Sequence, residues 1–145
     1  MRYWLPAVLW ASLIFSASTG AMSARNTSRF IGPFLHWLVP DISDEAVRAV
    51  QIVVRKTAHA VEYGLLSYLL WRVLRKPKKD DDRPWTWGPA LGALALAFLY
   101  AVTDEFHQSF VPSRGASPGD VMLDTVGAAL GLVVVWSWGR WRRRW

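Results

Sequence analysis

Four apolar stretches place the strongest constraint on what this chain can fold into. They cover approximately residues 3–19, 50–73, 87–104 and 119–138 of the 145-residue chain. A helix needs about 20 largely apolar residues to cross the hydrocarbon core of a bilayer, and shorter stretches suffice when Trp and Tyr lie at the interface. The sequence therefore predicts an all-α integral membrane protein, with four transmembrane helices in a small bundle and a single domain over residues 1–145.

The first apolar stretch has an alternative interpretation as a secretory signal peptide. The letters "SAS" near its end are similar to a cleavage site, but Arg2 alone makes a thin basic region before it. Trp4 and Trp10 are more typical of a helix that stays in the mature protein. We therefore expect this stretch to be retained as a span.

Basic residues gather on one predicted side of the membrane. Eleven of the seventeen Lys and Arg residues precede the first span, follow the fourth, or lie in the linker between the second and third: Arg2, Arg72, Arg75, Lys76, Lys78, Lys79, Arg83, Arg140, Arg142, Arg143 and Arg144. By the positive-inside rule, both termini and this linker are cytoplasmic, and the segment 104–120 is extracytoplasmic. We expect a multi-pass protein of the cell membrane. The net charge of +6 then reflects topology and attraction to anionic lipid, not nucleic-acid binding.

The segment between the first two spans is apolar but too short to cross a membrane. "FIGPFLHWLVP" begins at Phe30 and predicts an interfacial or re-entrant piece, with a helix packed against the bundle as the alternative. Ser43 follows as a candidate N-cap, and Asp44 and Glu45 favour the positive end of a helix dipole. We expect one long helix from there through Trp71.

The second span carries a polar stripe. At about 100° per residue, a lysine, a histidine, a tyrosine and a serine share a sector of about 80°, with two charged residues at its edges. They are Lys56, His59, Tyr63 and Ser67, with Arg55 and Glu62 at the edges. Ionisable groups inside a span normally face a bundle interior or a water-filled cavity, which predicts a site. The alternative is that these side chains bond across helices and hold the bundle together.

The run "DEFHQSFVPSRGASPGD" joins the third and fourth spans. Asp104 and Glu105 close the third span, where carboxylates oppose the helix dipole and need a cationic partner. Arg114, and the lysine and histidine of the polar stripe, are the candidates on the same side. Together with Gln108, these groups are expected to meet the polar stripe at the outer membrane surface.

The fourth span opens with a strong helix start. Ser117 falls at the N-cap, a proline follows at N1, and Asp120 falls at N3, so Asp120 has a capping role as the alternative to a site role. Asp124 lies one turn deeper and has no capping role. Both aspartates project within about 60° of Gly127 and Gly131. These glycines have the spacing that lets another helix approach closely, so we expect this face to point into the bundle.

These residues carry a resemblance to a known family. The chain is similar to the VanZ-like family of membrane proteins over "RKTAHAVEYGLLSYLL" and "DEFHQSFVPSRGASPGDVMLDTVGAALG", within residues 50–132. The family's motif falls on Lys56, His59, Glu62, Tyr63, Asp104, Glu105, Gln108, Phe110, Pro112, Arg114, Asp120, Asp124, Gly127 and Gly131. Many members carry Asn where this chain has Asp124. The resemblance implies a cell-envelope membrane protein, and the family takes its name from an accessory factor in resistance to the glycopeptide antibiotic teicoplanin.

The leading hypothesis is an outward-facing polar pocket that binds an envelope component. The candidates are a membrane lipid head group, a lipid-linked cell-wall precursor or a glycopeptide antibiotic. Seven residues are candidates for substrate binding: Lys56, Tyr63, Asp104, Gln108, Arg114, Asp120 and Asp124. Lys56 and Arg114 would hold an anionic group, and the aspartates would orient these cations or engage a substrate cation. Whether the pocket also catalyses a reaction is left open, and the candidates for proton exchange are His59, Glu62 and Glu105.

Three other functions are alternatives. A small transporter or flippase would use the ionisable groups within the spans, but the polar stripe ends near mid-membrane. A metal-dependent hydrolase could draw nitrogen and oxygen ligands from His59, Glu62, His107, Asp104 and Asp120, but the chain has no recurrent motif such as HExxH and no cysteine for a thiolate site, so no metal or other cofactor is expected. A structural or assembly protein would use the polar cluster as an internal brace.

Overall fold

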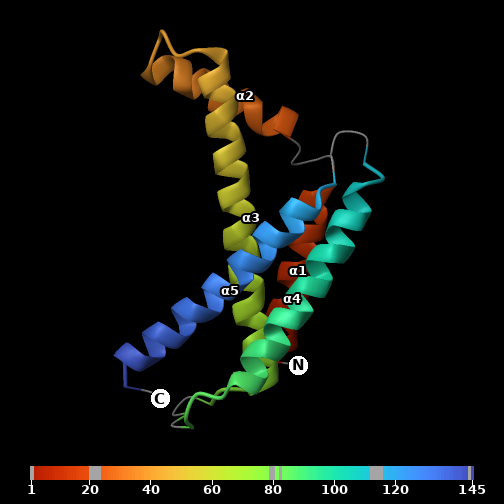
Figure 1. The fold of residues 1–145 in the computed structure, drawn as a ribbon, viewed down its shortest axis with the longest axis vertical. Coiled ribbons are helices and arrows are strands. Elements are labelled where there is room, and N and C mark those ends of the chain that lie inside the picture. Colours follow the sequence, from red (N-terminus) through yellow and green to blue (C-terminus); the bar gives the residue numbers. More distant parts are fainter. Residues whose placement is uncertain (1, 20–23, 79–80, 82, 112–115, 144) are drawn as a thin grey trace.

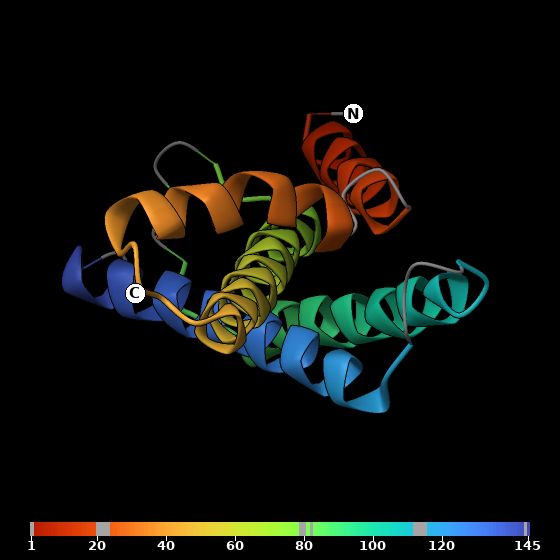
Figure 2. The same cartoon turned by 90° about the horizontal axis from the view of Figure 1, so that it is seen from above.

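The computed structural model describes the chain except residues 1, 20–23, 79–80, 82, 112–115 and 144, and the described residues form five helices. In chain order they are α1 (Trp4–Ser18), α2 (Ala24–Leu38), α3 (Asp44–Arg75), α4 (Trp87–Gln108) and α5 (Pro118–Trp141). The central element is α3, because it packs against each of the other four helices and most extensively against α5. Figures 1 and 2 show α1, α4 and α5 around one part of α3, with α2 across its far end.

The long helix predicted from Ser43 is confirmed. The Ser43 hydroxyl accepts a hydrogen bond from the backbone N–H of Ala46 at 3.3 Å, and the first turn carries the two acidic residues that favour a helix start. The helix continues one turn past Trp71 to Arg75. It ends there because Lys76 adopts a left-handed conformation, with φ of 49°, which is a common way to terminate a helix.

The expectation of four spans is met only in part. Within the described ranges, α4 with 22 residues and α5 with 24 residues are long and apolar enough to cross a membrane. The apolar helix α1 has 15 residues and rises only about 22 Å, against about 30 Å for a hydrocarbon core. Helix α3 has 32 residues, but Arg55, Lys56, His59 and Glu62 interrupt its apolar sequence. Length and composition therefore give two candidate spans, not four.

The end of α4 lies further along the chain than predicted. The helix continues to Gln108, so Asp104 and Glu105 lie inside it, and all three residues are buried. Gln108 donates a side-chain hydrogen bond to Asp104 at 3.0 Å, an i, i+4 pair that stabilises this last turn. His107 belongs to the same turn, and its ring lies 4.6 Å from the ring of Phe15.

The inner face of α4 is made of alanine. The buried apolar residues of this helix are Ala90, Ala93, Ala97 and Ala101, whose spacing of three and four residues puts them on one face. Because these side chains are small, neighbouring helices approach closely. The wholly buried ring of Tyr63 packs in the same core cluster as Ala97 and Ala101.

Helices α3 and α5 cross in direct backbone contact. A side-chain carbon added at Gly127 would lie 2.6 Å from Cα of Ala60, and one added at Gly131 would lie 2.7 Å from Cα of Gly64. Carbon atoms in contact normally lie about 3.5 to 4.0 Å apart, so glycine is required at both positions. The two glycines on α5 thus meet a second pair of small residues on α3, in the spacing expected for close helix packing.

Both chain ends and the described part of the linker 76–86 lie at the same end of the bundle (Figure 1). The Tyr3 hydroxyl donates a hydrogen bond to the carbonyl of Pro77. The ring of Trp145 lies 5.4 Å from that of Trp85 and 6.0 Å from that of Trp71. Aromatic packing therefore joins the last turns of α3, the end of the linker and the C-terminus.

At the far end of α3, helix α2 presents an exposed aromatic face. Phe30, Phe34 and Trp37 are all more than half exposed, while the helix packs on α3 across its axis (Figure 2). This continuous helix, with Pro33 inside it, is not a re-entrant hairpin, and its contact with α3 agrees with the alternative of a helix packed against the bundle.

Candidate functional site

The polar stripe of α3 meets the adjoining ends of α4 and α5 around a small cavity. Its volume is about 30 Å³, enough for about two water molecules. Three groups of residues line it: Arg55, Lys56 and His59 from α3, Glu105 and Gln108 from α4, and Asp120, Leu123 and Asp124 from α5. Segments some fifty residues apart in the sequence therefore form one site.

An ion pair lies at the rim of this cavity. The ammonium nitrogen of Lys56 is 2.9 Å from Oδ1 of Asp120, and these side chains are 46% and 27% exposed. The helix cap is provided separately, because the Ser117 hydroxyl accepts the backbone N–H of Gly119 at 3.1 Å. The carboxylate of Asp120 is therefore used to bind Lys56, and not as the acid of a capping box.

A histidine and an aspartate lie deeper in the cavity. Nδ1 of His59 is 3.7 Å from Oδ1 of Asp124, which is longer than a hydrogen bond. Asp124 is only 1% exposed, and neither of its oxygens has a hydrogen-bond partner among the described residues. A buried carboxylate without donors is unfavourable. Asp124 therefore needs a proton, a water molecule or a ligand group to satisfy it.

Asp104 belongs to a neighbouring network that joins α4 to α1. The hydroxyl of Ser18 donates to Oδ2 of Asp104 at 2.7 Å, and Nε2 of Gln108 donates to the same oxygen at 3.0 Å. Asp104 itself does not line the cavity. Ser18 is a contributor that sequence reasoning missed. The only signal for it was a small hydroxyl residue at the end of an apolar helix.

Glu105 fastens the start of α5 to the end of α4. Its Oε2 accepts the backbone N–H of Ser117 at 2.9 Å, and the side chain is buried at the cavity wall. The sequence predicted a cationic partner for the carboxylates here. Of the candidates, Lys56 binds Asp120, and Arg114 lies outside the described residues, as does Pro112 of the family motif.

The rest of the polar stripe packs away from the cavity. Tyr63 is completely buried, and its ring centroid lies 6.2 Å from that of Tyr100. The Ser67 hydroxyl lies 2.8 Å from the carbonyl of Ala128, to which it donates across α3 and α5. Glu62 is half-buried and does not line the cavity. The part of the stripe before Ala60 thus borders the cavity, and the part after it is packed or bonded between helices, as in the alternative interpretation.

The described ranges contain no group of three or more His, Asp or Glu side chains placed to hold a metal ion together.

An all-helical fold with two apolar helices of spanning length, and with carboxylates and a histidine gathered between helices, is typical of a small membrane protein. Comparison with known families defines it further. The chain belongs to the VanZ/LLP1 family, whose sequence model matches residues 3–139, nearly the whole chain. The resemblance predicted from the motifs is thereby confirmed and now includes α1 and α2. No curated protein and no solved structure matches the chain.

Proposed function

We propose that this VanZ-family chain crosses the cell membrane four times, through α1, α3, α4 and α5, with α2 at the outer surface. The arrangement of α1 supports this, because Leu5, Leu9 and Leu13 are all more than half exposed and would face lipid. The basic residues at the end that carries both termini and the linker support a cytoplasmic location for that end. The small cavity then lies toward the extracytoplasmic face.

The cavity binds the head group of a membrane lipid or of a lipid-linked envelope precursor that carries both a phosphate and an amine. One observation carries this proposal: the two walls of the cavity have opposite charge. The wall from α3 is basic, with Arg55, Lys56 and His59, and the wall from α4 and α5 is acidic, with Glu105, Asp120 and Asp124. A ligand with one anionic and one cationic group matches both walls.

The size of the cavity limits which part of the ligand enters it. A volume of about 30 Å³ is far below the roughly 300 to 1,000 Å³ of sites that enclose drug-sized molecules. It admits a single small group such as an ammonium. The phosphate and the remainder of the ligand would therefore lie at the rim.

The exposed fractions of the side chains indicate where each ligand group would bind, with the phosphate at the rim and the ammonium inside the cavity. Lys56 is nearly half exposed, and its ammonium keeps donors for a phosphate oxygen while it binds Asp120. Asp124 is buried with unsatisfied oxygens, which suits an ammonium donor. His59, beside Asp124, is the group best placed to exchange a proton there.

A one-sided binding site is favoured over a transport path. Below His59, the backbones of α3 and α5 touch at Ala60 and Gly127, which supports a closed floor. The accessory role in glycopeptide resistance that the family name implies would follow if an amine of the antibiotic competes for the same carboxylates. The alternative is that the polar cluster binds no ligand and only holds the helices together, and the binding experiment distinguishes the two.

The test compares two short-chain phospholipids binding to the purified protein in detergent. Phosphatidylethanolamine carries the amine and phosphatidylglycerol does not, so we expect phosphatidylethanolamine to bind in the cavity more tightly than phosphatidylglycerol does. Asp124→Asn and Lys56→Gln should each weaken that binding by about tenfold or more. Asp44→Asn, at an 82% exposed side chain, and Lys76→Gln, in the exposed linker, are the matched controls and should bind like the wild type.

Each alternative result has a definite meaning. If both cavity variants weaken phosphatidylglycerol binding as much as phosphatidylethanolamine binding, the proposed ligand class is rejected. Unchanged phosphatidylethanolamine binding by Asp124→Asn rejects the cavity as the site. Unchanged phosphatidylethanolamine binding by both cavity variants, with both less heat-stable than their controls, identifies the cluster as a brace.

A further inference from the structure

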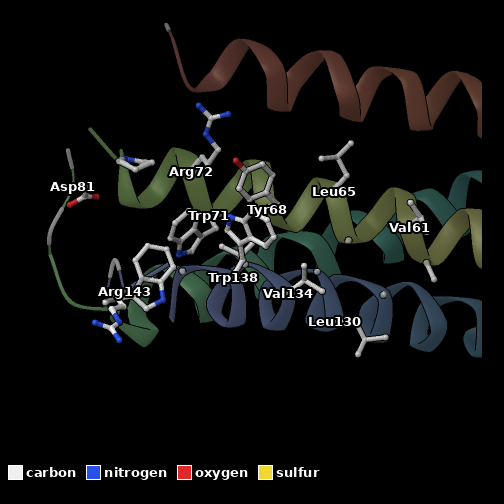
Figure 3. A pocket seen from close by; sticks show the side chains of 18 of the residues that line it. Val61, Leu65, Tyr68, Trp71, Arg72, Asp81, Leu130, Val134, Trp138 and Arg143 are labelled. Atoms are coloured by element: carbon white, nitrogen blue, oxygen red, sulfur yellow. The ribbon is translucent and has the colours of Figure 1, made fainter. Parts of the chain in front are cut away.

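A much larger hollow lies between α3 and α5 at the opposite end of the bundle. It is a groove of about 1170 Å³ that runs down to the linker 76–86 and the last residues of the chain (Figure 3). None of the residues that line it also lines the small polar cavity. Any ligand of this groove is therefore independent of the head-group site.

The walls of the groove are apolar along most of its length. Val61 and Leu65 of α3 and Leu130, Val134 and Trp138 of α5 line it, and Figure 3 shows them along the two helices. All five side chains are exposed in the chain by itself. Such a surface lacks polar groups that a ligand would have to satisfy, and it suits hydrocarbon chains.

One end of the groove is basic. Arg72, Lys78 and Arg143 line it there, and the Arg72 guanidinium is held 5.7 Å over the ring of Tyr68. Asp81 is the single acidic residue among the lining residues, and two arginines balance the charge of its carboxylate. Its carboxylate accepts hydrogen bonds from the Arg83 and Arg75 side chains, at 2.7 and 3.4 Å.

The pKa of Asp81 is held well below its usual range, chiefly by the hydrogen bond from Arg83, with Arg75 contributing. The carboxylate therefore stays ionised and paired with these arginines. Arg72, Lys78 and Arg143 remain to attract an anion at this end of the groove.

The apolar part of the groove matches one leaflet of a bilayer in length. The residues of α3 that line the groove run from Thr57 to Arg72, and the apolar ones run from Ala60, at the helix crossing, to Trp71, which corresponds to a rise of about 17 Å at 1.5 Å per residue. Half of a hydrocarbon core is about 15 Å thick. The apolar walls thus span the depth of one leaflet, and the basic end falls at its polar surface.

We propose that this groove binds an anionic phospholipid of the leaflet at the end where the chain termini lie. The acyl chains pack against Val61, Leu65 and Val134, and the phosphate binds between Lys78 and Arg143. A second copy of the chain fits less well, because its own basic residues would meet these at the same membrane surface. This proposal goes beyond the head-group site, which lies at the other end and selects an amine.

The first test fills the groove. Val134→Trp places a large side chain in it, and Val133→Trp makes the same change at a neighbouring exposed position that does not line it. Binding of phosphatidylglycerol to the detergent-purified protein is measured by native mass spectrometry. We expect Val134→Trp to lose most of the bound lipid and Val133→Trp to retain it, with unchanged helix content by circular dichroism in both.

The second test removes the charge. The double variant Lys78→Gln, Arg143→Gln should bind phosphatidylglycerol roughly 30-fold more weakly, about fivefold for each basic residue near a lipid surface. The double variant Lys76→Gln, Arg140→Gln removes the same charge from residues that do not line the groove. Each pair contains one residue with a left-handed backbone, Arg143 or Lys76, so the two are matched in backbone conformation as well.

Three results would overturn the proposal. One is equal retention of phosphatidylglycerol and phosphatidylcholine by the wild type, which means ordinary surrounding lipid. Another is an equal loss of binding in the groove variants and their controls. The third is a wild-type dimer that Val134→Trp dissociates, which makes a second copy the occupant. Asp124→Asn should leave phosphatidylglycerol binding unchanged, so failure here is distinguishable from failure of the head-group site.

Discussion

Replacing Gly131 by alanine should force α3 and α5 apart. The added carbon would lie 2.7 Å from Cα of Gly64, whereas carbon atoms in contact lie about 3.5 to 4.0 Å apart. Because the obstacle is backbone, the helices must separate locally by about 1 Å. Overpacking of this kind costs about 1–3 kcal/mol, and the better helix propensity of alanine offsets up to about 1 kcal/mol of it. We expect a net loss of about 1–2 kcal/mol.

The assay is reversible unfolding of the purified protein in mixed micelles, followed by circular dichroism. Gly88→Ala is the control, because a carbon added at Gly88 has no neighbouring atom within 4 Å, and it should leave stability unchanged or slightly higher. Gly127→Ala should destabilise like Gly131→Ala. The double variant should lose less than the sum, since one separation of the helices relieves both clashes. If Gly131→Ala is as stable as Gly88→Ala, the backbone contact between α3 and α5 is not as described.

Three further outcomes are expected. Asp124→Asn should keep or raise the free energy of unfolding, by up to about 1 kcal/mol, because it replaces a buried carboxyl group without hydrogen-bond donors by an amide that cannot ionise; a clear loss in thermal unfolding would contradict this. Ser18→Ala removes the 2.7 Å hydrogen bond to Asp104 and should lower stability by about 1–3 kcal/mol, measured in the same way. Asp81 has a depressed pKa in the folded protein, so its contribution is present above about pH 4 and is lost as the pH falls further. The stability difference between wild type and Asp81→Asn should therefore shrink in acid, and a constant difference would refute the role of that carboxylate.

Helix starts could be predicted from sequence because their signals are local. Ser43 and Ser117 both cap a helix as expected, each through its own hydroxyl. The end of α4 was placed too early, since the helix is extended by a side-chain bond between Gln108 and Asp104. Asp104 also accepts a hydrogen bond from Ser18 of α1. A contact with a distant helix cannot be predicted from the local sequence of α4.

The members of the polar stripe were predicted to share one face of the helix, but the division of that face between a cavity and a packed part was not predictable. A helical projection treats Tyr63 and Ser67 as equivalent to Lys56 and His59. In the fold, α5 crosses α3 at Ala60, so residues before the crossing border the cavity and those after it are covered. The position of such a crossing depends on how the two helices pack together and cannot be read from the sequence of one helix. The small residues on α5 alone indicated that one would exist.

The groove was not predicted because no residue pattern encodes it. Val61 and Val134 belong to two separate apolar stretches of the sequence, 50–73 and 119–138. They border one hollow only because α3 and α5 diverge beyond their contact at Gly64 and Gly131 (Figure 1).

The alanine face of α4 determines which mutagenesis strategy can reveal how this bundle is held together. Systematic substitution to alanine would leave Ala90, Ala93, Ala97 and Ala101 untouched, although each is at most 3% exposed. Such a survey would report an apparently tolerant helix and would miss its packing surface. Substitution in the opposite direction, to leucine at each of these positions, would reveal it. Sequence variation in α4 should accordingly be limited in side-chain volume on this face and much freer on the other.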